Sequence, residues 1–168
     1  GRNSEAEGCF LKAVELDPDF VAALTGLGRT EAALGKLDSA FKHLETAVEI
    51  EPHDANAQLA SAQVLESLGR PDDALAAYFR TLEADPFQVE ASRRIAAIQI
   101  GRDEADLALV RLDQTIESSP SDAEALYLRG RAHLVLGHFT QAVADLRGAS
   151  QRLADRPEVH MALARALA

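Results

Sequence analysis

The side chains that could do chemistry are few and lie far apart along the chain. Five histidines stand at His43, His53, His133, His138 and His160, and no two of them are four residues apart. A helical metal site usually needs such an i, i+4 pair with an acidic third ligand. His133 and His160 fall on helix faces expected to pack against a neighbour, so we expect partly buried structural histidines there. The histidines predict no metal site.

Glycines and the single cysteine do not predict a reactive site either. Gly28 and Gly35 followed by Lys36 resemble a phosphate-binding loop only superficially, because six residues separate the glycines and Leu37 stands in place of Ser or Thr. Cys9 has no histidine nearby in the sequence, which favours a buried or half-buried thiol. We therefore predict no catalytic residue and no cofactor, and expect that this chain is not an enzyme.

Composition and charge narrow the class of protein. The chain has 168 residues, 47% of them hydrophobic, which is enough to bury a core. A formal charge of -10 argues against nucleic acid as a partner, since that requires a basic surface. No apolar run approaches the length of a membrane span and no signal peptide is evident, so we expect no direct membrane insertion. Cytoplasmic and periplasmic locations both stay open.

A repeat of constant length organises the chain. Prolines recur every 34 residues, at Pro18, Pro52, Pro86 and Pro120. Small residues form a column at Ala6, Ala40, Ala74, Ala108 and Ala142, and large residues form another at Phe10, Leu44, Tyr78, Leu112 and Leu146. A small column lets two helices approach while the large column fills the space beside it. The spacing predicts helical hairpins that need one another, with Asp54 and Asp122 as helix N-caps.

These columns resemble the tetratricopeptide repeat, in which a small residue, glycine, alanine, a large residue and proline recur in this order. The resemblance covers the whole chain and implies an all-α fold, a right-handed superhelical solenoid of antiparallel helix pairs. In its register, residues 1–20 are the second helix of a partial repeat. Complete repeats follow at 21–54, 55–88, 89–122 and 123–156, and 157–168 opens another repeat. We expect one array, 1–168. A start at Gly1-Arg2-Asn3 without methionine predicts a fragment of a longer protein.

Two departures from the family pattern predict altered helix ends. Asp103 stands where other repeats have glycine and Gly101 comes two residues earlier, so the first helix of 89–122 is expected to end early. Ala154 replaces the proline of the last complete repeat, and Pro157 follows three residues later. The second helix of 123–156 is therefore expected to run longer, with Arg152 in its final turns.

The resemblance also implies where a partner would bind. The first helices of this family line a concave groove through repeat positions 2, 5, 9 and 12, which share one helical face. The candidate groove residues are Arg29, Asn56, Leu59, Gln63, Arg93, Tyr127, Arg131 and Arg165. Four arginines on that face predict an acidic or C-terminal segment as ligand, because arginine binds carboxylates bidentately. Alternatively, these arginines pair with acids on adjacent helices, such as Glu66, Glu90, Glu124 and Glu158.

Three hypotheses for function follow. The first is a non-enzymatic scaffold that binds a protein or peptide segment, possibly acidic, in the groove. The second is a recognition or regulatory arm of a multidomain enzyme, such as a group transferase, whose catalytic domain lies outside this chain. The third is self-association through uncapped hairpin ends. Chaperone-binding relatives have Lys and Asn at positions 5 and 9, where this chain has Thr25 and Arg29, which argues against a chaperone-tail receptor.

Overall fold

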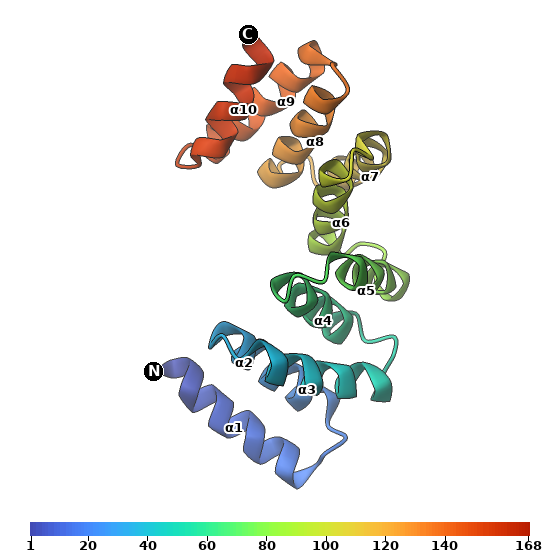
Figure 1. Ribbon diagram of the computed structural model, residues 1–168, viewed down its shortest axis with the longest axis vertical. Helices are drawn as coiled ribbons and strands as arrows, with labels where there is room; N and C mark the ends of the chain where they lie inside the picture. Colours follow the sequence, from blue (N-terminus) through green and yellow to red (C-terminus); the bar gives the residue numbers. More distant parts are fainter. The chain divides into compact units, whose positions relative to one another are not determined.

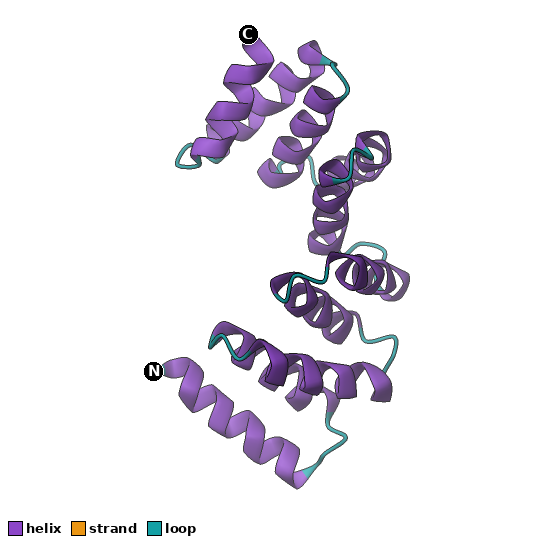
Figure 2. Cartoon of the chain, viewed as in Figure 1, coloured by secondary structure: helices purple, strands orange, loops and turns teal.

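The protein is an all-helical chain. The computed structural model describes residues 1–168, which form ten α-helices and no strand (Figures 1 and 2). The helices are α1 Arg2–Leu16, α2 Val21–Ala33, α3 Leu37–Ile50, α4 Ala55–Ser67, α5 Pro71–Ala84, α6 Val89–Gly101, α7 Ala105–Ser118, α8 Ala123–Val135, α9 Phe139–Arg152 and α10 Pro157–Leu167. The expected all-α fold class is confirmed.

The chain divides into two compact units, residues 1–91 and 92–168. The first contains α1 to α5, and the second contains most of α6 together with α7 to α10. First helices of successive pairs begin at Val21, Ala55, Val89, Ala123 and Pro157, a spacing of 34 residues. That residues 1–168 form one array within a longer protein stays a prediction.

Residues 1–91 are built by neighbouring helices that pack in chain order. α1 packs on α2, α2 on α3, α3 on α4 and α4 on α5, while α2 also touches α4. The column residues Ala40, Leu44 and Ala47 of α3 are fully buried. A Cβ atom added to Gly28 of α2 would lie 2.5 Å from the Leu44 Cγ. The absent side chain at Gly28 is therefore what lets α2 and α3 approach.

Residues 92–168 repeat this packing around one continuous core. Buried side chains from α6 to α10 form a single cluster that includes Ile100, Leu112, Leu146 and Val159. α8 packs on α9, α9 on α10, and α8 also touches α10. A Cβ on Gly130 would lie 2.6 Å from the Leu146 Cγ. The same small-against-large contact thus joins α8 to α9.

The turn inside each helix pair has one geometry. The residue that follows the end of the first helix by two positions has a positive φ, and the next backbone N–H donates back to the carbonyl five residues earlier, as in His138 to His133. Gly35, Gly69 and Gly137 occupy this position, and Asp103 occupies it in the remaining pair with a φ of 62°.

Asp103 therefore keeps the turn that glycine forms in the other pairs. The predicted ends of α6 and α9 were both wrong. α6 does not end early, since its 13 residues match those of α2, α4 and α8. α9 does not run longer, since its 14 residues match those of α3, α5 and α7. The N-cap predictions are confirmed, because the carboxylates of Asp54 and Asp122 each accept from two backbone N–H groups.

The glycine contact predicts opposite effects for two substitutions in the same helix pair. Gly130→Ala should destabilise the protein by about 1–3 kcal/mol, because the new methyl group overlaps Leu146. Gly148→Ala, on α9, should stabilise it by up to about 1 kcal/mol, because its nearest neighbour is Leu126 at 3.5 Å and alanine favours helix. Urea denaturation of both variants measures the difference, and equal effects would contradict the contact.

The strained turn predicts a stabilising substitution. Asp103→Gly should raise the free energy of unfolding by up to about 1 kcal/mol, since glycine adopts a positive φ without a Cβ clash. The reciprocal change Gly137→Asp should lower it by a similar amount. Thermal melts of the two variants test this expectation, and a destabilised Asp103→Gly protein would show that the carboxylate itself supports the turn.

Candidate functional site

One hollow lies in the second unit, between first helices of neighbouring pairs. It has a volume of about 420 Å³ and is lined from α6, α8 and α10. Tyr127, Arg131 and Arg165 from the predicted groove all line it. Apolar walls come from Ile100, Leu134, Val135, Met161 and Ala162. The structure therefore brings three of the eight predicted site residues together.

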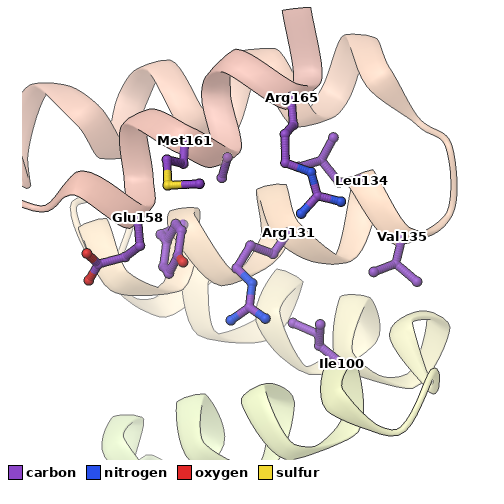
Figure 3. A pocket seen from close by; sticks show the side chains of 9 residues that line it. Ile100, Arg131, Leu134, Val135, Glu158, Met161 and Arg165 are labelled. Atoms are coloured by element: carbon purple, nitrogen blue, oxygen red, sulfur yellow. The ribbon is translucent and has the colours of Figure 1, made fainter. Parts of the chain in front are cut away.

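Two arginines of this hollow are available to a ligand. Arg131 is half-buried and Arg165 is exposed, and neither has an ion-pair partner within the chain. Figure 3 shows Arg165 extending from α10 toward α8, where Arg131 stands. The Arg131 guanidinium lies 5.7 Å from the centre of the Tyr127 ring, within cation–π range. For Arg131 and Arg165, the alternative of pairing with neighbouring acids does not hold.

Glu158 brings a negative charge to the same hollow, but that charge is neutralised locally. Its Oε1 accepts from Arg156 Nε at 2.6 Å, and Arg156 also pairs with Glu124. The backbone N–H of Glu158 and the Arg156 guanidinium lower the pKa of this carboxyl, so it is ionised at neutral pH. Arg156 lies 5.5 Å from the Tyr127 ring centre. The nearly buried Tyr127 ring is thus within cation–π range of two guanidinium groups.

Arg93 has a different role from the other predicted arginines. Its Nη1 donates to both carboxylate oxygens of Asp122, at 3.2 and 3.3 Å. Asp122 in turn caps α8 by accepting from the backbone N–H groups of Glu124 and Ala125. Arg93 therefore holds the start of α8, in line with the alternative that an inner arginine pairs with an acid, and it does not line the hollow.

The first unit has a smaller hollow of about 160 Å³ between α2 and α4. Arg29 and Gln63, both predicted, line it, and Arg29 has no ion-pair partner in the chain. Asn56 is exposed and Leu59 is half-buried on α4, but neither lines the hollow. One cation and one neutral amide make this a weaker anion site than the hollow of the second unit.

Charge is divided unevenly between the two units. Residues 1–91 contain 7 Lys and Arg against 17 Asp and Glu, whereas residues 92–168 contain 10 of each. The net charge of -10 therefore comes entirely from the first unit. Unpaired arginines in an electrically balanced unit attract an acidic ligand more strongly than the same arginines within an acidic unit.

Several residues that line the hollow were not among the predicted site residues, although a sequence signal was present. Glu158 occupies repeat position 2, Met161 position 5, and Ile100 and Leu134 position 12 in the repeat register. These positions belong to the same helical face that selected the arginines. Extending that face to apolar side chains would have found the walls of the hollow. Only the pairing of Arg156 with Glu124 and Glu158 had no sequence signal.

The burial of the histidines and of the cysteine agrees only in part with the sequence predictions. His133 is partly buried, as expected, and its Nδ1 lies 3.3 Å from His138 Nδ1 across the turn. The prediction for His160 was wrong, because it is exposed and only its Nε2 contacts the Ala154 carbonyl. Cys9 is exposed, so the expected buried thiol was also wrong. No group of three His, Cys, Asp or Glu side chains is placed to hold a metal ion.

Comparison with known families decides which family this helical array represents. Two family models, both described as tetratricopeptide repeat, match the sequence: one at residues 31–98 and 99–166, the other at 1–55. The chain belongs to the tetratricopeptide repeat family. No curated protein matches its sequence. None of its ten helices has the length and apolarity needed to cross a membrane.

Solved structures of this family share the fold. MamA superposes with a TM-score of 0.80 at 20% identity, covering 93% of this chain and 91% of its own. YrrB, described as a tetratricopeptide repeat protein with an unusual peptide-binding site, gives 0.79 at 22% identity, with 96% and 83% covered. PilW, described as a type IV pilus biogenesis factor, gives 0.84 at 21% identity, with 98% and 78% covered. At these identities the likeness shows the fold alone.

The environment of His133 predicts a pH effect on stability. Burial lowers the pKa of His133, and Arg129 and His138 add to this effect against the attraction of Asp145. The unfolded chain then takes up a proton near pH 6.5 that the folded chain does not. Stability should fall as the pH drops below about 6.5, toward the lowered folded pKa. Urea midpoints between pH 7 and pH 5 should fall less for His133→Gln, and parallel curves would contradict this.

Proposed function

We propose that this chain is a non-enzymatic protein–protein interaction scaffold that binds an extended peptide or protein segment along the first helices of its repeats. The observation that carries the proposal is the hollow between α8 and α10, where Arg131 and Arg165, which have no ion-pair partner, stand beside the exposed side chains of Val135 and Met161. Guanidinium groups without an internal ion-pair partner keep their capacity for charged hydrogen bonds to a ligand.

The side chains that the helices place at the surface support this proposal. Second helices place their column residues, such as Leu112 and Leu146, in the core. First helices also place polar and apolar side chains together at the surface, as Arg131 and Met161 do at the hollow of the second unit. A surface of this composition fits a peptide chain, which offers carboxylates and apolar side chains at regular intervals. Self-association through the chain ends stays a prediction.

The structural neighbours are consistent with a binding role. YrrB is described as having an unusual peptide-binding site, and PilW is described as a type IV pilus biogenesis factor. Binding of peptides or assembly components comes to this chain only as a proposal, because identity is 22% and 21%. Membership of the tetratricopeptide repeat family supports it independently.

Site-specific cross-linking tests whether a partner lies on the first-helix face. A photo-cross-linking amino acid at Met161, which lines the hollow, should capture a protein from a lysate of the source cells. The same probe at Val110, an exposed residue of the second helix α7, should not capture it. Mass spectrometry identifies the captured protein. Equal capture at both positions would place binding elsewhere and contradict the proposal.

A matched set of arginine variants provides the quantitative control. The triple change of Arg29, Arg131 and Arg165 to Ala should weaken binding of the captured partner at least tenfold, since each charged hydrogen bond contributes about 1.5–3 kcal/mol. The triple change of Arg2, Arg80 and Arg147 to Ala removes the same charge from exposed positions of α1, α5 and α9 and should leave affinity within about twofold. Circular dichroism confirms that both proteins are folded.

A further inference from the structure

The hollow between α8 and α10 has a definite order of side chains along its length. Met161 comes four residues before Arg165 on α10, and Val135 comes four residues after Arg131 on α8. Four residues return a side chain to the same face of a helix and advance about 6 Å along its axis. Figure 3 shows Met161 on one side of the two arginines and Val135 on the other. The cationic centre therefore lies between two apolar contacts.

Alternate side chains of an extended peptide are spaced nearly as far apart as these contacts of the hollow. Side chains two residues apart point to the same face of an extended chain and are about 7 Å apart. A carboxylate at the middle position would meet Arg131 and Arg165, and apolar side chains two residues before and after it would meet Met161 and Val135. The order apolar, acidic, apolar is symmetric, so it suits either direction of the peptide.

We infer that this hollow recognises an internal segment of a partner in which Asp or Glu is flanked, two residues away on each side, by apolar residues. The inference rests on the proposed function and specifies its ligand. A C-terminal carboxylate fits less well, because a chain that ends at the arginines would leave one of the two apolar contacts empty.

Electrostatics favours the acidic residue at the centre. The ionised groups at the hollow are Arg131, Arg156 and Arg165 together with Glu124 and Glu158, and they sum to one positive charge. Because Arg156 pairs with both glutamates, the two positive charges that face a ligand are those of Arg131 and Arg165. In the first unit, Arg29 is the single cation of the corresponding hollow, within an excess of ten acidic residues.

The experiment uses the single methionine as a reporter. Met161 is the only methionine of the chain and is 67% exposed, so ¹³C-methyl labelling gives one NMR signal at the hollow. The probe is the peptide Ser-Leu-Ser-Glu-Ser-Leu-Ser, acetylated and amidated. It should shift this signal in a saturable manner. The peptide of the same composition, Ser-Ser-Leu-Glu-Leu-Ser-Ser, places leucine one residue from glutamate and should bind at least threefold more weakly.

Peptide and protein variants then test the charge. Replacing the peptide glutamate by glutamine, or Arg131 and Arg165 by alanine, should each weaken binding at least tenfold. Arg165→Glu should reverse the preference, so that a lysine-centred peptide binds better than the glutamate-centred one. Arg147→Ala, at an exposed position of α9, should leave binding unchanged.

Three results would overturn the inference. If affinity does not change when the peptide glutamate becomes glutamine, the hollow does not require an acidic residue. If binding requires a free C-terminal carboxylate, tested with the peptide Ser-Leu-Ser-Glu, the ligand is a chain end and not an internal segment. If no peptide shifts the Met161 signal while cross-linking at Met161 still captures a partner, the inferred motif fails and the scaffold function stands. If cross-linking also fails, both fail.

Discussion

The close approach of two helices at a small residue, glycine in two pairs and alanine at Ala62 and Ala96 in the others, is the contact on which this structure depends. Gly28 and Gly130 have no side chain, and the leucines opposite them occupy the space where a Cβ would lie. The leucines are completely buried, and the contact contributes apolar burial at the centre of the α2–α3 and α8–α9 pairs. Because a helix pair exposes its remaining apolar surface, it is stable only when a neighbouring pair covers that surface.

This packing also determines which face remains for a ligand. The buried column of the second helices points into the core, so the first helices of neighbouring pairs meet at their edges, as α8 meets α10 and α2 meets α4. They leave hollows of about 420 and 160 Å³. The binding surface is therefore a consequence of the way the repeats pack.

Arginines on the first helices have acquired different roles through their surroundings. Arg93 is held by the N-cap carboxylate of α8, and Arg129 donates two hydrogen bonds of 2.7 Å to buried Asp145. These pairs stabilise helix ends and helix contacts, since removing one partner would leave a carboxylate unpaired. Arg131 and Arg165 have no such partner. Arginine thus stabilises the fold at some positions and stays available for a ligand at others.

The sequence by itself determined the helix pairs, their spacing of 34 residues, the buried columns and the N-caps at Asp54 and Asp122, because each depends on local periodicity or on residues close in the chain. Three of the eight predicted site residues line one hollow, and two line the other. Only the tertiary structure decided that Asp103 keeps the turn geometry of the glycines, that Cys9 and His160 are exposed, and that Arg93 is paired whereas Arg131 is not. Exposure and ion pairing depend on side chains brought from other helices, and a repeat pattern does not specify them.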